Sequence, residues 1–185
     1  HSDTLSQPAF PSGFPTNWVQ GADNNYSMTG DYEVDPDVVN APAYSPHLTA
    51  ALTQIPSLSL SMHVDDWFDP DTGIYANSNL NDVPEWERAC SAELIWPDGR
   101  EGFAINCGVR VAGQTSPLNF KSPKLSLRIK FKDEYGPTRL RLKDPLYSDS
   151  PLESFNTLVL DARLNNVWVH PSGSQRNMGQ YTRDQ

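Results

Sequence analysis

The feature of this 185-residue sequence that most constrains its fold is a β-hairpin centred on Asp98-Gly99. An Asp-Gly pair suits a type I′ turn, because both central residues of that turn need positive φ. Pro97 lacks the N–H that the tightest hairpin uses, so a wider loop with the same register is an open alternative. In either form, the period of two along a strand sets three pairs on one face: Leu94 opposite Phe103, Ala92 opposite Ile105, and Cys90 opposite Cys107.

Cys90 and Cys107 are the only cysteines, and this register makes them direct cross-strand partners. Opposed residues of antiparallel strands have Cβ atoms close enough for a disulfide when the pair is not hydrogen-bonded. We therefore predict a disulfide between them. Two buried free thiols are the alternative.

The composition predicts a mainly β (α+β) fold, built as an antiparallel sheet of hairpins with few short helices. The 16 prolines, 11 glycines and 37% hydrophobic residues indicate many turns and long loops. No apolar run is long enough for a membrane span, and no signal peptide is visible in the sequence. Because the chain starts on His, we expect a processed product or a piece of a longer protein.

Charge divides the chain into two unlike parts. The first 87 residues hold 13 acidic residues and no Lys or Arg, whereas the rest holds 14 basic and 10 acidic residues. The net charge of −9 argues against nucleic acid as the main partner, since phosphate binding needs a basic surface. The asymmetry predicts an acidic arm that lies on or beside a basic sheet.

The chain divides into three predicted regions. Residues 1–56 form a proline-rich arm, for which disorder is the alternative to an extended segment anchored by aromatic side chains. One short helix is expected in it, over 46–54, with Ser45 as N-cap and Pro46 at the first helical position. Residues 57–173 form the antiparallel β domain, and 174–185 begin a truncated helix. The expected anchors are the arm aromatics: Phe10, Phe14, Trp18, Tyr26, Tyr32 and Tyr44.

Alternating patterns predict strands over 57–62, 125–131, 139–143 and 155–160. If the second and third of these pair with their apolar rows inward, six cations share the outer face: Arg128, Lys130, Lys132, Arg139, Arg141 and Lys143. Like charges opposite one another across a ladder repel. We therefore expect acids of the arm to neutralise them, with these candidates: Asp31, Glu33, Asp35 and Asp37.

The acidic run from Asp65 to Asp71 offers several oxygens of the kind that calcium prefers. It lacks the terminal Glu of an EF-hand loop, so a capped helical turn followed by a loop is the favoured interpretation and no metal site is assigned. Sequence motifs of metalloproteases, nucleotide-binding loops and serine hydrolases are absent. The four histidines show no metal-ligand spacing, and His170 is interpreted as a packing or surface residue.

An ordered set of short segments resembles the CotH-like proteins, the family of spore coat protein H. The resemblance covers roughly residues 31–185. Its strongest segments are Gly73-Ile74-Tyr75-Ala76-Asn77, Trp86-Glu87-Arg88, Gly108-Val109-Arg110-Val111-Ala112-Gly113, Pro123-Lys124-Leu125-Ser126-Leu127-Arg128 and Tyr135-Gly136-Pro137. The match continues in Phe155-Asn156-Thr157-Leu158-Val159-Leu160, Asn165-Asn166-Val167-Trp168 and Tyr181-Thr182-Arg183-Asp184-Gln185. Asp31-Tyr32-Glu33-Val34-Asp35-Pro36 resembles the lead-in of secreted, multidomain bacterial members.

The resemblance implies an atypical protein-kinase-like fold that uses ATP and Mg²⁺, with this chain as its β-rich N-terminal lobe. The turn from Gly108 through Gly113 to Ser116 would then lie over phosphates, and Lys124 would pair with them. Leu125 replaces the commoner Lys or His after Lys124, so Lys121 and Lys130 stay open as alternatives for that lysine.

The family's catalytic and metal-binding aspartates are expected beyond this chain, so the resemblance assigns it no catalytic or metal residue and no bound cofactor. A non-catalytic, β-rich binding or structural domain is the alternative function. Both interpretations imply an extracellular or cell-surface protein that meets a protein substrate or an anionic surface component.

Overall fold

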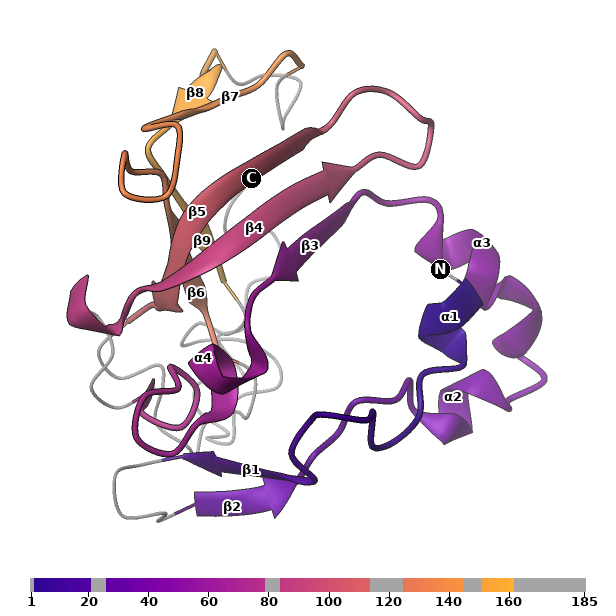
Figure 1. Ribbon diagram of the computed structural model, residues 1–185. Helices are drawn as coiled ribbons and strands as arrows, with labels where there is room; N and C mark the ends of the chain where they lie inside the picture. Colours follow the sequence, from indigo (N-terminus) through magenta and orange to yellow (C-terminus); the bar gives the residue numbers. More distant parts are fainter. Residues whose placement is uncertain (1, 21–25, 79–83, 114–124, 145–150, 162–185) are drawn as a thin grey trace, which may run out of the picture.

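The computed structural model describes residues 2–20, 26–78, 84–113, 125–144 and 151–161 (Figure 1). Its centre is a curled antiparallel sheet of five strands in the order β3-β4-β5-β6-β9. These are β3 (Ser57–Ser61), β4 (Arg88–Ile95), β5 (Phe103–Val111), β6 (Leu127–Lys130) and β9 (Thr157–Leu160). The predicted mainly β class with few short helices is thus confirmed, and strands lie within the predicted ranges 57–62 and 125–131. The strand predicted over 155–160 is divided, because Phe155 belongs to a separate short strand and only 157–160 form β9.

The hairpin of β4 and β5 has the predicted register. Leu94 pairs with Phe103, Ala92 with Ile105 and Cys90 with Cys107. β4 ends at Ile95 and β5 begins at Phe103. The connection is therefore the wider loop, the alternative that the missing N–H of Pro97 suggested. Gly99 in that loop has φ of 76°, in the left-handed region that glycine reaches without steric cost.

Neighbouring strands extend one apolar face across the sheet. Val109 pairs with Ile129, which pairs with Leu158 on β9, and Leu58 of β3 pairs with Leu94. Ala92, Val109 and Ile129 are fully buried. This apolar face packs against residues from the segment 67–75, among them Ile74 and Tyr75.

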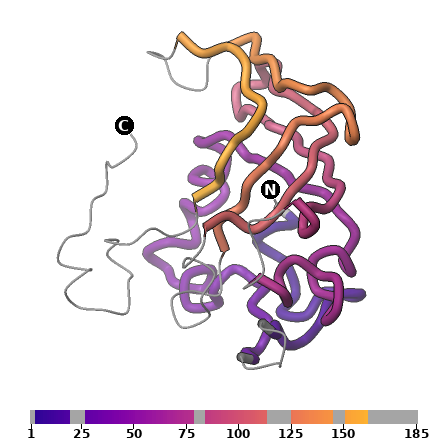
Figure 2. The backbone as a smooth tube through the Cα atoms, turned by 90° about the vertical axis from the view of Figure 1, so that its left-hand side faces the viewer, coloured from indigo at the N-terminus to yellow at the C-terminus, as the bar shows by residue number. Residues whose placement is uncertain are grey.

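The predicted pairing of 125–131 with 139–143 is wrong. β7 (Leu140–Arg141) instead pairs with β8 (Ser154–Phe155), while β9 occupies the free edge of β6. The reason lies in the connection, where the N–H groups of Tyr135 and Gly136 both donate to the carbonyl of Lys132 and turn the chain away from β6. The six cations therefore do not share a single sheet face. Figures 1 and 2 place the β7–β8 pair and the N-terminal hairpin at opposite ends of the molecule.

The N-terminal region contains more regular structure than predicted. It holds α1 (Ser2–Leu5), a hairpin of β1 (Asn17–Gln20) with β2 (Tyr26–Thr29), α2 (Pro36–Val39), the 3₁₀ turn η1 (Ser45–His47) and α3 (Leu48–Leu52). The predicted helix corresponds to η1 and α3. Ser45 is not its N-cap, because it is already the first residue of η1, with Pro46 next.

The acidic segment after β3 forms the predicted capped helical turn, α4 (Val64–Phe68). The side chain of His63 accepts a hydrogen bond from the N–H of Asp65 and so caps its N-terminus. Asp69 follows the helix and accepts from the N–H groups of Asp71 and Thr72, each at 2.9 Å. These backbone donors hold the pKa of Asp69 below its usual range. A second 3₁₀ turn, η3 (Pro84–Trp86), leads into β4.

The helix predicted over 174–185 lies outside the described residues, as does the part of the predicted β domain beyond 161. Within the described ranges, no helix combines the length and apolar character needed to cross a membrane.

Candidate functional site

The candidate site lies on the side of the sheet opposite the apolar face, which we call the polar face. Strand alternation places nine described residues of β4, β5 and β6 on it: Ala89, Ser91, Glu93, Ala104, Asn106, Gly108, Arg110, Arg128 and Lys130. The turn that follows β6 curls over this face, since a Cβ on Gly136 would contact Asn106. The backbone of this turn therefore covers part of the polar face.

A buried carboxylate organises this face. Glu87 stands one residue before β4, and its side chain is only 1% exposed. The Lys132 ammonium lies 2.5 Å from Glu87 Oε1, and the Arg110 guanidinium lies 3.9 Å from Glu87 Oε2. The Arg110 side chain is 9% exposed and that of Lys132 is 32% exposed. Two cations so placed offset much of the cost of burying the charge.

Gly108 makes room for this carboxylate. A Cβ at that position would lie 2.6 Å from Glu87 Oε1 and would also overlap the ring of Tyr135. Any larger residue would have to displace one of those two groups. The glycine inside β5 is thus explained by the close approach of Glu87 and Tyr135 to the strand backbone.

Tyr135 completes what we call the Glu87 cluster, formed by Glu87, Arg110, Lys132 and Tyr135. The Lys132 ammonium lies 6.0 Å from the centre of the Tyr135 ring. Burial, and then the negative charge of Glu87, raise the pKa of Tyr135 to about 12. The phenol therefore stays neutral through the physiological range.

Two further cations lie beside the cluster on β6. Arg128 is the direct cross-strand partner of Arg110, and Lys130 is the partner of Gly108. Lys130 donates to the Thr157 hydroxyl on β9 at 2.9 Å. Like charges opposite one another are unfavourable in a ladder, and the ion pair of Arg110 with Glu87 offsets part of this repulsion.

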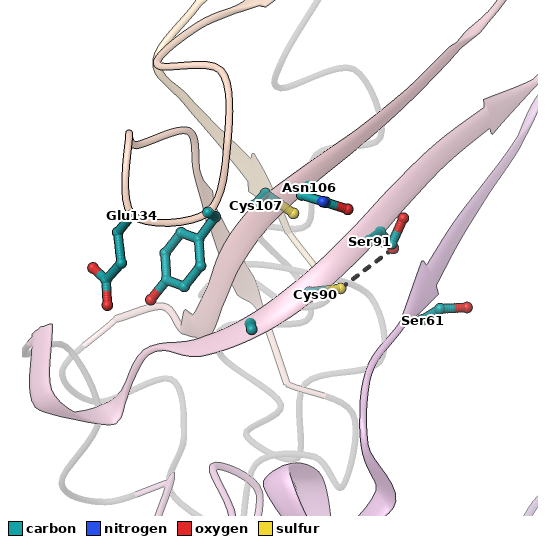
Figure 3. Close-up of a pocket in the computed structure, with 8 residues that line it drawn as sticks. Ser61, Cys90, Ser91, Asn106, Cys107 and Glu134 are labelled. Atoms are coloured by element: carbon teal, nitrogen blue, oxygen red, sulfur yellow. Dashed lines mark hydrogen bonds between the residues drawn. The ribbon is translucent and has the colours of Figure 1, made fainter.

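A pocket of about 380 Å³ adjoins the cluster, and its wall includes Cys90, Cys107, Glu134 and Tyr135 (Figure 3). The structure has both cysteines as free, buried residues, so the predicted disulfide is not formed in it. The Cys90 thiol donates to the Ser91 carbonyl at 3.4 Å. The neighbouring thiol lowers the pKa of Cys90, and the same neighbour together with burial raises the pKa of Cys107. The predicted cross-strand pairing is confirmed, and oxidation of the pair stays a prediction.

The predicted phosphate residues fall in different places. Gly108 lies inside β5, so the turn that was predicted to start there begins only after Val111. Gly113 follows, with φ of 98° in the left-handed region. Ser116, Lys121 and Lys124 lie outside the described residues. Of the candidate lysines, the structure describes Lys130 alone, and its phosphate role stays a prediction.

The predicted neutralisation of the basic strands by the arm is only partly seen. Lys132 pairs with Glu87, which belongs to the acidic first 87 residues. None of the four arm acids, Asp31, Glu33, Asp35 and Asp37, forms an ion pair within the described ranges. Lys143 pairs with Glu101 of the hairpin loop at 2.6 Å instead.

Sequence reasoning did not identify the Glu87 cluster, although a signal for it existed. The predicted hairpin register, continued three pairs beyond Cys90 and Cys107, sets Glu87 opposite Arg110. Opposite charges at directly paired positions favour an ion pair. Lys132 and Tyr135 could not be added in this way, because their place depends on the turn after β6.

No protein-family model, curated protein or solved structure matches this chain. The resemblance to CotH-like proteins is therefore carried by the sequence segments alone. Among the described residues, no group of three or more His, Cys, Asp or Glu side chains is placed to hold a metal ion.

Proposed function

We propose that this chain is the β-rich N-terminal lobe of a secreted, bacterial CotH-like protein kinase, and that its polar face binds the phosphates of a nucleotide. The observation that carries this proposal is the direct cross-strand pairing of Arg110 with Arg128, next to Lys130. Because Arg110 is buried against Glu87, the half-buried Arg128 and Lys130 are the cations of this basic patch that would meet phosphate oxygens. The extracellular or cell-surface location, and the protein substrate of the whole kinase, belong to the same proposal.

The chemistry of the patch fits a polyphosphate better than a single carboxylate. A guanidinium can donate two parallel hydrogen bonds to one phosphate, and a lysine adds a mobile point charge. Gly113, two residues after β5, has a conformation that lets backbone approach a ligand closely. The residues that follow it in sequence include Ser116 and Lys124, which would complete the phosphate site.

ATP and Mg²⁺ are implied for the full-length family. The described residues offer cations for phosphates and no cluster of metal ligands, so we derive no metal step from them. Mg²⁺ would neutralise charge on the β- and γ-phosphates, and its ligands would come from the rest of the kinase. The polar face would bind and orient the nucleotide without transferring a phosphoryl group.

Titration of the chain with ATP by calorimetry tests the proposal. We expect weak binding that falls steeply with ionic strength, because the contacts are partly exposed ion pairs. Lys130→Ala should weaken ATP binding about tenfold, because the substitution removes one charge-assisted hydrogen bond. Arg139→Ala is the matched control: this exposed cation on the segment before β7 donates to Ser154 and should leave the affinity unchanged. Equal affinity for wild type and Lys130→Ala would disprove the phosphate site.

A second assay addresses the enzyme class. Incubation of the chain with radiolabelled ATP and a generic protein acceptor should give no transferred label, since no residue in it is assigned to orient the nucleophile. Sustained transfer, with contaminating kinase excluded, would contradict this assignment.

The alternative proposal is a non-catalytic extracellular domain whose basic patch holds an anionic surface component. A sulfated polysaccharide distinguishes the two, because it carries dense negative charge without a nucleotide. If it binds as tightly as ATP and is equally sensitive to Lys130→Ala, the binding-domain function replaces the kinase lobe.

A further inference from the structure

A second pocket, of about 530 Å³, lies on the other side of the sheet, where the N-terminal hairpin meets α4. Leu60 and Leu127 of the apolar face contribute to its wall together with Met62. The remaining wall is dominated by five aromatic side chains: Phe14, Trp18, Tyr32, Trp67 and Phe68. Ser61 is the only wall residue that it shares with the pocket beside the Glu87 cluster, so the two pockets are distinct.

The aromatic rings hold one another in fixed orientations. Trp18 and Tyr32 meet edge to face with centroids 5.3 Å apart, and Trp67 and Phe68 do so at 6.1 Å. The Tyr32 hydroxyl donates to the carbonyl of Pro15 at 2.8 Å, which fixes that ring further. A Cβ on Gly30 would lie 2.7 Å from the Tyr32 ring, so the ring also packs closely on backbone. The pocket is therefore pre-organised before any ligand enters.

Among the described residues, none that lines the pocket is acidic, but two carboxylates belong to the helix that supplies part of its wall. Ten of its eleven wall residues come from positions 14–68, inside the first 87 residues that contain 13 acids and no Lys or Arg. His63 is the one wall residue that can become a cation, and its Nδ1 lies 3.6 Å from a carboxylate oxygen of Asp65. Asp65 and Asp66 belong to α4, as do the wall residues Trp67 and Phe68.

We propose that this pocket binds a small quaternary ammonium ion of the choline type. The negative faces of several aromatic rings attract a cation, and its methyl groups are compatible with the apolar wall. The exposed carboxylate of Asp65 adds a modest preference for positive charge, whereas Asp66 already pairs with Arg88 at 3.9 Å. This site is independent of the nucleotide site, because neither Arg128 nor Lys130 lines it.

Choline and its neutral carbon isostere, 3,3-dimethylbutanol, form a matched pair of probes for the wild-type protein. They have nearly the same shape, so their difference in affinity reports the contribution of the charge. We expect choline to bind about 3- to 30-fold more tightly, which corresponds to the usual range for cation–π attraction. Quenching of tryptophan fluorescence would follow both titrations. Equal affinities, or no binding by choline, would overturn the proposal.

Substitutions locate the binding site. Trp67→Leu should weaken choline binding about tenfold, since it removes one ring face from the wall. Trp96→Leu is the matched control, because Trp96 lies beside Arg100 near the far loop of the hairpin. Asp65→Asn should weaken choline binding about twofold and leave the affinity for dimethylbutanol unchanged, because it removes one exposed negative charge. Should Trp67→Leu fail to fold, the Asp65 variant and the comparison of the two probes still decide the proposal.

Phosphocholine separates two sources of the same ammonium group. A free quaternary amine has only its positive charge, whereas the phosphocholine of a lipid or surface glycan adds negative charge that Asp65 repels. We expect phosphocholine to bind more weakly than choline. Tighter binding of phosphocholine would reject the free amine as the ligand.

Discussion

The two faces of the central sheet differ in how they are filled. The apolar face is a continuous set of Val, Ile and Leu side chains, with Val109 and Ile129 fully buried at its centre. The polar face has a buried charged residue, Glu87, at an equivalent depth. Burial on the first face follows from hydrophobicity alone, whereas burial on the second requires each charge to find a partner. The polar face is therefore the more demanding of the two.

This difference predicts different responses to mutation. A core with apolar side chains tolerates substitutions that keep volume and shape. A buried ion cluster does not, because the loss of one member leaves the remaining charges in a medium that solvates them poorly. Three substitutions, all in or beside the buried ion cluster, test this expected sensitivity of the polar face.

Glu87→Gln should have the largest effect, a loss of about 3 kcal/mol in the free energy of unfolding. The amide keeps the shape of the carboxylate and removes the charge that Arg110 and Lys132 share. Glu93→Gln is the matched control, because Glu93 is exposed on the same face and should change stability by less than about 0.5 kcal/mol. If urea unfolding gave the two variants equal losses in the free energy of unfolding, the buried charge of Glu87 would have no particular effect on stability.

Gly108→Ala should cost about 1 to 3 kcal/mol, the usual range for overpacking. The added methyl group would overlap Glu87 and Tyr135. Because Tyr135→Ala removes one of the two obstacles, the double variant should be more stable than the sum of the two single losses implies. Strict additivity would show that Tyr135 does not restrict this position.

The smallest effect concerns pH. The pKa of Tyr135 is raised to about 12 in the folded chain, from an ordinary value of 10.0. The unfolded chain therefore loses this proton first, and the associated stability is present below pH 10 and lost as the pH rises toward 12. Wild type should lose stability relative to Tyr135→Phe across that window. A gap between the two that stays constant from about pH 9 to 12 would contradict the raised pKa.

Much of the sheet could be predicted from sequence, because its information is local. The Asp98-Gly99 loop and the alternation around Cys90 and Cys107 determine the register of β4 and β5 without any tertiary knowledge. Likewise Pro46 placed the start of the short helix to within one residue, since the helical turn begins at Ser45. Each of these elements is specified by residues close together in the chain.

The failures have a common physical cause. Residues 139–143 alternate as well as residues 125–131 do, but alternation does not state which strand becomes the neighbour. The turn at Lys132 to Gly136 decides that, and it sends the chain toward β8 rather than back along β6. The cover of the polar face depends on the same turn. Only one part of the Glu87 cluster, the pairing of Glu87 with Arg110, could therefore have been predicted from the sequence.

The order of strands in the sheet also has a kinetic consequence. β4 and β5 are joined by the short loop 96–102, whereas β6 and β9 pair across residues 131–156. Closing the longer loop costs more chain entropy before any contact is gained. The β4–β5 hairpin is thus expected to form early in folding, with the edge strands β3 and β9 added later. Substitutions at Ala92 or Ile105 should then slow folding, whereas substitutions at Leu158 should mainly speed unfolding.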